Sequence, residues 1–140
     1  MQNKNPVKSV LIVEDDPLQQ LQLSAILNKL GQFHSTYIDI NVSSNLSDAM
    51  QSVRHKKYDL ILADLILEKG ELGLDLLQHC QEDRKCAFVV TSGKNDVEIA
   101  RLRKANSAPF LYISKFKPLL KYMANLESFL FTDTKIAEAQ

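Results

Sequence analysis

The sequence predicts an α/β fold in which a doubly wound sheet of five parallel strands carries helices on both faces. Two observations support this prediction: short apolar runs alternate with longer helical patterns, and the first apolar run is unbroken. An unbroken run is typical of a strand that is buried on both faces of a parallel sheet. Alternation of strands and helices favours parallel pairing, because each return to the same edge needs a crossover connection.

The composition is that of an ordinary globular domain. The 140 residues include 17 Lys or Arg and 17 Asp or Glu, so no net charge draws the chain to nucleic acid or to a membrane. No apolar run reaches roughly 18 residues, and residues 1–8 lack the apolar core of a secretory signal. We therefore expect a cytoplasmic domain over residues 7–132, with flexible ends at 1–6 and 133–140. Cys80 and Cys86 have no metal-binding spacing and are expected to be free thiols.

The apolar runs place the five strands at residues 9–13, 34–41, 59–63, 87–91 and 110–114. Helical patterns occupy residues 17–31, 45–56, 73–83, 95–106 and 118–131. Asn45 or Ser47 can cap the second helix, and Asn95 the fourth, because their side chains accept hydrogen bonds from free backbone N–H groups.

The first helical pattern has two apolar stripes. The stripe expected to face the core contains Leu23, Ile26, Leu27 and Leu30, at the spacing of one helical face. The second stripe consists of Leu18, Leu21 and Ala25. Pro17 near the start and Gly31 just past the expected end are the residues favoured at helix termini.

The last helical pattern also divides into two sets. The set expected to face the core is Leu119, Tyr122, Met123, Leu126, Phe129 and Leu130. Leu120, Ala124 and Phe131 fall outside that arc, as an apolar margin that folding does not require.

Polar side chains follow four of the strands. The first strand is followed by Glu14, Asp15 and Asp16, the third by Asp64, the fourth by Thr91 and Ser92, and the fifth by Lys115. Ligands of open parallel sheets bind beyond the carboxyl ends of the strands, so we expect these groups to converge. Two carboxylates about 4 Å apart repel by roughly 4 kcal/mol at an effective dielectric constant of about 20. Such a cluster favours a hard cation with oxygen ligands, and Mg²⁺ fits best.

Four motifs in this order, VEDDP, YDLILAD with GLDLL downstream, VVTSG and YISK, resemble the receiver domain of bacterial two-component response regulators. The resemblance covers Val7 to about Phe131 and implies the flavodoxin-like strand order 2-1-3-4-5. It also implies that Asp64 accepts a phosphoryl group from a histidine kinase or phosphotransfer protein. Mg²⁺ would be held by Glu14, Asp15, Asp64 and the backbone carbonyl of Ile66. Thr91 would be the switch hydroxyl, Lys115 the cation that balances phosphoryl charge, and Tyr112 the rotating aromatic.

The resemblance further implies a regulatory domain rather than an enzyme, one that assists only its own phosphorylation and dephosphorylation. Kinases and phosphotransfer proteins would dock beside the acids, near Leu18 and Leu21. Output would run through the face formed by residues 95–106, 110–114 and 118–131, with Leu120 on it, by dimerisation or capture of a protein target. No direct binding to nucleic acid or membrane is expected.

Some positions depart from the receiver pattern. Glu68 and Leu72 stand where a proline and a glycine are usual, and Gly73 comes one residue late. Phe116 follows Lys115 in place of the usual proline, so Lys117, which precedes Pro118, is a rival for the lysine role. A pseudo-receiver that docks without accepting phosphate is therefore the main alternative.

A flavodoxin-type FMN carrier is disfavoured because three acids would repel the phosphate. A haloacid-dehalogenase-like phosphatase is disfavoured because the acids are not spaced D-x-D.

Overall fold

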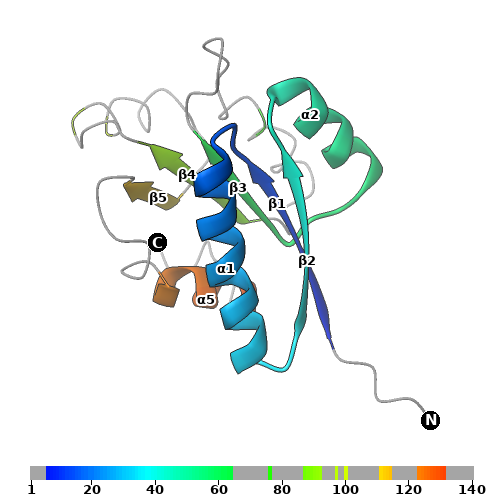
Figure 1. Cartoon of the computed structure of the whole chain (residues 1–140), viewed down its shortest axis with the longest axis vertical. Coiled ribbons are helices and arrows are strands. Elements are labelled where there is room, and N and C mark those ends of the chain that lie inside the picture. The colour runs from blue at the N-terminus through cyan, green and yellow to red at the C-terminus, as the bar shows by residue number, and fades with distance from the viewer. Residues whose placement is uncertain are drawn as a thin grey trace.

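The computed structural model describes residues 6–64, 76, 87–92, 97, 100, 111–114 and 123–131. Within them the strands are β1 (Val7–Val13), β2 (Tyr37–Ser43), β3 (Leu60–Asp64), β4 (Ala87–Ser92) and β5 (Leu111–Ser114). The helices are α1 (Pro17–Phe33), α2 (Leu46–His55) and α5 (Met123–Phe131). All neighbouring strands pair in parallel, in the order β2-β1-β3-β4-β5 (Figure 1). The predicted α/β fold with a parallel sheet is confirmed.

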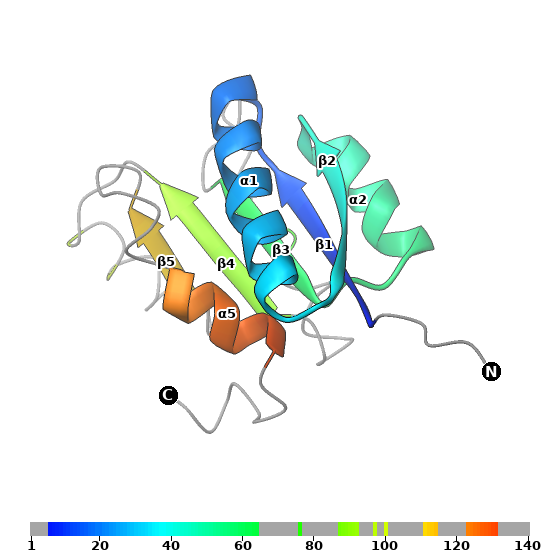
Figure 2. The ribbon, with the colours of Figure 1, turned by 60° about the horizontal axis from the view of Figure 1, so that its bottom comes forward.

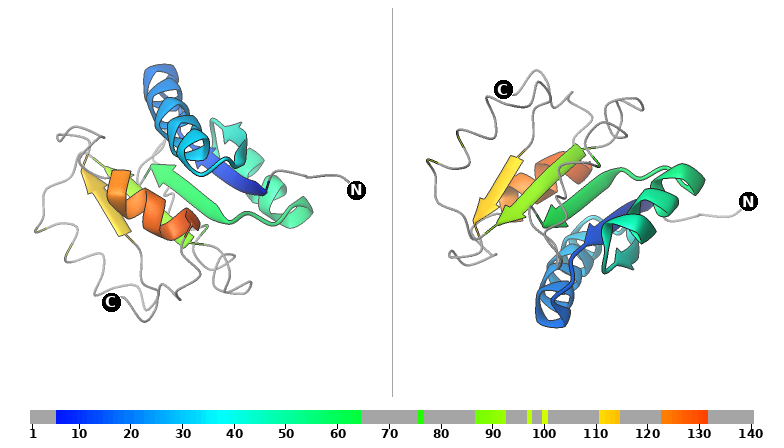
Figure 3. Two further views of the ribbon diagram at one scale, coloured as in Figure 1. Left: turned by 90° about the horizontal axis from the view of Figure 1, so that it is seen from below. Right: turned by 90° about the horizontal axis from the view of Figure 1, so that it is seen from above.

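Helices cover both faces of the sheet. Helices α1 and α5 lie on one face and α2 lies on the other (Figures 2 and 3). Side chains from α1, α5 and one face of β1, β2 and β3 form a core cluster of Val10, Ile12, Leu23, Leu27, Leu30, Ile38, Leu60, Leu62, Leu126 and Leu130. Successive strand residues point to opposite faces, so Leu11 and Ile61, which are also buried, belong to the side that α2 covers.

The apolar run of β1 is unbroken because this strand lies inside the sheet, and both of its faces are covered. Residues Val10 to Val13 are fully buried, and they pair with β2 on one edge and with β3 on the other. This is the environment that the sequence pattern predicted.

Helix α1 begins as expected and ends later than expected. Asp16 is its N-cap, and Pro17 occupies the first turn. The prediction that Gly31 ends the helix is wrong, because the helix continues to Phe33 and Gly31 is buried inside it. A Cβ at Gly31 would lie 2.7 Å from Ile38 Cγ1 and 2.7 Å from the carbonyl oxygen of Thr36. Glycine is therefore needed for close approach to β2, and not as a helix stop.

The end of α1 explains why β2 begins at Tyr37 and not at residue 34. Ser35 adopts a left-handed backbone with φ of 49°. The N–H of Ser35 donates to the carbonyl of Gln32 at 3.2 Å, and the N–H of Thr36 donates to the carbonyl of Gly31 at 2.8 Å. These two bonds are the Schellman termination of a helix, with serine at the position that glycine usually takes.

Helices α2 and α5 test the predictions made for a helix cap and for a core-facing set of residues. Asn45 caps α2 by accepting from the N–H of Asp48 at 2.8 Å, which decides between the two residues proposed as caps. In α5, Leu126 and Leu130 are buried and Met123 and Phe129 are partly buried, as predicted. The prediction for Phe131 is wrong: it packs against the core cluster, and its ring stacks on His34 with centroids 3.9 Å apart.

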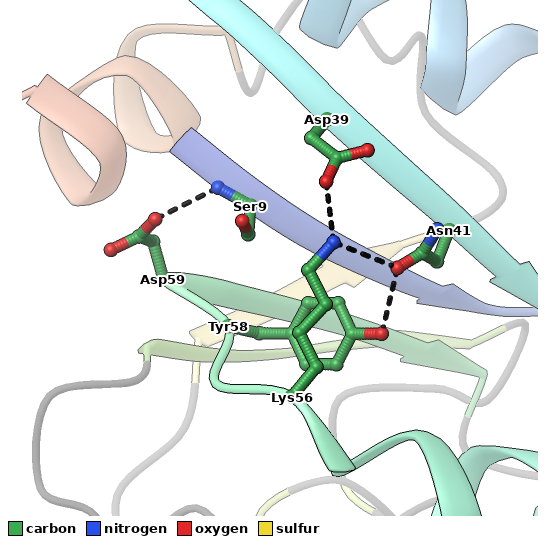
Figure 4. A network of polar contacts seen from close by, with 6 residues as sticks. All are labelled: Ser9, Asp39, Asn41, Lys56, Tyr58 and Asp59. Atoms are coloured by element: carbon green, nitrogen blue, oxygen red, sulfur yellow. Dashed lines mark hydrogen bonds and ion pairs between the residues drawn. The ribbon is translucent and has the colours of Figure 1, made fainter. Parts of the chain in front are cut away.

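A polar network, which we call the β2 network, links the edge strand β2 to the α2–β3 connection (Figure 4). It consists of Asp39, Asn41, Lys56 and Tyr58. Lys56 Nζ forms a short ion pair with Asp39 Oδ2 and donates to Asn41 Oδ1 at 3.2 Å. The hydroxyl of Tyr58 donates to the same Asn41 oxygen at 2.8 Å, and Lys56 Nζ lies 5.5 Å from the centroid of the Tyr58 ring. The network fastens the edge of the sheet to the segment that leads into β3.

Several predictions fall outside the described residues. They include the helix expected at 95–106 apart from Val97 and Ala100, the helix expected at 73–83 apart from Leu76, and both cysteines. The same holds for residues 1–5 and 132–140, so the predicted domain limits stay a prediction. In the part of the chain that the structure describes, no helix is long and apolar enough to span a membrane.

Candidate functional site

The carboxyl ends of β1 and β3 bring three carboxylates together. Glu14 and Asp15 follow β1 directly, and Asp64 is the last residue of β3. One carboxylate oxygen from each of the three lies within 4.8 Å of the others. Glu14 and Asp64 are only 1% and 6% exposed, whereas Asp15 is half-buried. Residues distant in sequence thus form one acidic site, which we call the carboxylate cluster.

The buried position of Glu14 follows from strand pairing. The N–H of Glu14 donates to the carbonyl of Ser43 at 3.0 Å, so pairing between the β1 and β2 segments continues one residue beyond β1. Its side chain accepts a bond from the N–H of Asp16 at Oε2, at 3.2 Å. The carboxylate of Glu14 therefore helps to stabilise the turn after β1, the same turn that carries Glu14 into the site.

Asp16, the third acid of the run, has a different task from its neighbours. It is exposed, and its Oδ1 accepts a hydrogen bond from the N–H of Leu18 at 3.1 Å. This bond satisfies a backbone donor that the first turn of α1 leaves without a helical partner. The three consecutive acids thus divide into two that face Asp64 and one that begins the helix.

Strand register places two further predicted residues near this end of the sheet. Thr91 of β4 is the direct neighbour of Asp64 in the β3–β4 pairing. Tyr112 of β5 pairs with Val90, one residue before Thr91. Three other predicted site residues, Ile66, Lys115 and Leu120, and the rival Lys117 lie outside the described residues.

The second stripe of α1 is exposed. Leu18 and Leu21 are 61% and 69% exposed, and Ala25 is exposed as well. This excludes core packing as the reason for the stripe. Leu18 is the second residue of α1, and so the stripe begins at the end of the helix that adjoins the carboxylate cluster.

Gln20 belongs to the site and was not found by sequence reasoning. Its side-chain Nε2 donates to the carbonyl oxygen of Glu14 at 2.6 Å and to Ser44 Oγ at 3.3 Å. A glutamine in the first turns of a helix has no pattern that marks it as a site residue. Only the folded turn shows what its amide reaches.

The donor set fits a hard divalent cation. Carboxylate oxygens are the ligands that Mg²⁺ takes from proteins, usually one or two of them together with water. Glu14, Asp15 and Asp64 would supply these oxygens, and the like charge of the three groups favours a cation among them.

The fold and the site define a class of protein: a doubly wound α/β domain with an acidic site at the carboxyl ends of its central strands. The family model described as the response regulator receiver domain matches residues 10–118. The chain belongs to this family.

Three similar proteins illustrate the match. The sensory transduction protein LytR of Staphylococcus saprophyticus is 28% identical over 86 residues, which are 61% of this chain and 32% of that protein. The receiver domain of the response regulator PhyR from Erythrobacter litoralis has a TM-score of 0.73 at 22% identity, covering 92% of this chain and 94% of that one. The Mn²⁺-bound form of the response regulator Rcp1 has a TM-score of 0.69 at 22% identity, covering 91% and 98%. The chain spans about a third of the length of the LytR relative.

Proposed function

We propose that this chain is a phosphoacceptor receiver domain in which Asp64 takes a phosphoryl group from a histidine kinase or phosphotransfer protein in the cytoplasm. The observation that carries the proposal is the convergence of Glu14, Asp15 and Asp64, with Thr91 as the direct neighbour of Asp64 on β4. The five-stranded order 2-1-3-4-5 supports this proposal, and the helices expected at residues 73–83 and 95–106 would complete the receiver fold. The domain acts as a regulator and not as an enzyme on other substrates.

The reaction is a displacement at phosphorus. An oxygen of the Asp64 carboxylate attacks, an O–P bond forms, and the P–N bond to the donor imidazole breaks, with its electron pair returning to the nitrogen. Glu14 and Asp15 would hold Mg²⁺ together with Asp64 and the Ile66 carbonyl. When bound, the ion neutralises charge on the phosphoryl oxygens. Lys115 balances further charge, and the Thr91 hydroxyl donates to a phosphoryl oxygen.

Output follows from a packing change. Movement of Thr91 toward the phosphoryl group leaves space that Tyr112 fills, and so alters the face formed by residues 95–106, β5 and the last helix. Leu120 belongs to this face, which binds a protein target or a second copy. The kinase or phosphotransfer protein docks on the exposed stripe of Leu18, Leu21 and Ala25, because exposed apolar residues next to a reactive group suit a helical partner.

One experiment with two phosphoryl sources tests the proposal. Native protein, Asp64→Asn and Leu18→Asp are treated with a small-molecule phosphodonor and, separately, with a phosphorylated phosphotransfer protein, and acyl phosphate is quantified by mass spectrometry. We expect Asp64→Asn to accept nothing from either source. Leu18→Asp should accept from the small donor at the native rate and from the protein roughly tenfold more slowly, a loss of about 1.4 kcal/mol in the docked complex.

Two outcomes would change the proposal. Native protein that accepts no phosphoryl group from either source, with Mg²⁺ present, would make the domain a pseudo-receiver. Equal loss with both donors in Leu18→Asp would make that residue structural. Leu21→Asp is the matched second variant, and Gln22→Asp, at an exposed polar position of the same helix, is the control for added charge.

A further inference from the structure

Gln20 joins the two turns that border the carboxylate cluster. It lies in the first turns of α1, and its amide reaches the β1–α1 turn at Glu14 and the β2–α2 turn at Ser44. The amide nitrogen carries two hydrogens, one for each of these acceptors. The side chain therefore bridges two loops, one 6 residues before Gln20 in the sequence and the other 24 residues after it.

The acceptor on the first loop is the backbone carbonyl oxygen of Glu14, between two members of the carboxylate cluster. The carbonyl of Glu14 belongs to the peptide bond that connects Glu14 to Asp15. The N–H of Glu14 is already bonded to the carbonyl of Ser43 at 3.0 Å. With Gln20 on the carbonyl at 2.6 Å, both backbone groups of Glu14 are fixed. The direction in which the chain enters Asp15 is fixed as a result.

The other side of Asp15 is held by the same residue. The backbone N–H of Gln20 donates to the carbonyl of Asp16 at 3.0 Å, as an ordinary bond of the first helical turn. Asp15 thus stands between two carbonyls, those of Glu14 and Asp16, which both accept from Gln20. Asp15 is the half-buried member of the cluster, whereas Glu14 and Asp64 are buried.

We infer that Gln20 is a positioning residue for the metal site: its amide holds the Glu14–Asp15 peptide so that the Asp15 carboxylate faces Asp64. The inference rests on the proposed function, because it assumes that Asp15 binds Mg²⁺. Groups that orient metal ligands from outside the coordination shell typically contribute 10- to 100-fold to affinity. Gln20 acts on the backbone of a ligand and not on the carboxylate itself, so its contribution belongs at the lower end of that range.

The test compares Mg²⁺ affinity and stability in five proteins: native, Gln20→Met, Gln20→Asn, Gln22→Met and Asp15→Ala. Methionine keeps the length of the side chain without its donors, and asparagine keeps the amide but is one methylene too short to reach both acceptors. We expect both Gln20 variants to bind Mg²⁺ roughly tenfold more weakly in a calorimetric titration. Gln22→Met, at an exposed position of the same helix, should bind as the native protein does.

A phosphodonor assay separates positioning from general damage. If Gln20 only positions Asp15, the rate in the Gln20 variants returns to the native value at saturating Mg²⁺, whereas a damaged fold leaves it low at every concentration. Native affinity in both Gln20 variants, or a rate that excess Mg²⁺ does not restore, would overturn the inference. Failure of the proposed function looks different: native protein itself would then accept no phosphoryl group at any Mg²⁺ concentration, or would bind Mg²⁺ no better than Asp15→Ala does.

Discussion

The carboxylate cluster and the β2 network are both groups of polar side chains held between strands and loops, but their chemistry differs. In the β2 network an ammonium group meets a carboxylate, and a phenol and an amide complete the set. In the carboxylate cluster three groups of the same charge lie within 4.8 Å. The network has complementary donors and acceptors and needs nothing from outside to stabilise the fold. The cluster concentrates negative charge, which is useful only if a cation or a reaction makes use of it.

Protonation in the β2 network reflects this complementarity. The hydrogen bond to Asp39 raises the pKa of Lys56, with burial opposing it. Burial raises the pKa of Tyr58, although nearby Lys56 works in the opposite direction. Both groups therefore keep the protonated form in which they donate. The two sites should respond in opposite ways to substitution, and the following predictions test that contrast, starting with the largest expected effect.

The largest effect is expected at Tyr58, the buried member of the β2 network. Tyr58→Ala should lower the free energy of unfolding by about 3 kcal/mol, since a buried aromatic ring is replaced by a cavity. Tyr58→Phe keeps the ring and loses the bond to Asn41, at about 1 kcal/mol. Urea denaturation measures both, and Tyr37→Ala, at an exposed ring, is the control and should change little. Weaker Mg²⁺ binding in Tyr58→Phe would contradict the separation of the two sites.

A smaller effect of opposite sign is expected at Asp15. Asp15→Asn removes one like charge from the carboxylate cluster and should stabilise the metal-free protein by about 1 kcal/mol. Asp39→Asn removes one partner of a half-exposed ion pair and should destabilise by about 0.5 kcal/mol. Thermal melts in a metal chelator measure both. A lower melting temperature than native in Asp15→Asn, without a lower one in Asp39→Asn, would contradict the expected difference between the two sites.

The smallest effect concerns alkaline pH. In the unfolded chain Tyr58 and Lys56 lose their protons near their ordinary pKa values of 10.0 and 10.5, and in the folded domain they do so at higher pH. Their contribution to stability is therefore complete below about pH 10 and is lost as the pH rises through the folded values. Urea midpoints from about pH 9 to about pH 11 should fall less steeply in Tyr58→Phe than in the native protein. Parallel slopes for the two proteins would show that Tyr58 contributes nothing to this loss.

The sequence was most informative where one local pattern had one physical cause. The unbroken run from Val10 to Val13 is typical of a strand covered on both faces, and the acids after it pointed to the carboxyl end of the sheet. Gly31 misled because glycine serves both as a helix stop and as a site of close approach, and sequence cannot tell which. The helix instead ends with Ser35 in the left-handed conformation, which serine rarely adopts.

The β2 network and Gln20 could not be predicted for a different reason. Asp39, Asn41, Lys56 and Tyr58 are individually ordinary residues for a strand edge and a loop, and their relation exists only once β2 lies beside the α2–β3 connection. Gln20 likewise acquires its role from Ser44, a residue of another loop. Tertiary hydrogen bonds of this kind leave no periodicity in the chain.

Because β2 approaches α1 closely at Gly31, position 31 should tolerate amino-acid substitution much less well than the exposed positions of the helix. Substitutions at exposed sites of the helix, such as Gln22 or Asn28, leave the spacing between α1 and β2 as it is. Any side chain at position 31 would require both the Ile38 side chain and the carbonyl oxygen of Thr36 to move. In a library of random variants, position 31 should therefore retain glycine while its solvent-facing neighbours accept most residue types. Gly31, which has no side chain, would therefore be among the positions of the helix that accept the fewest substitutions.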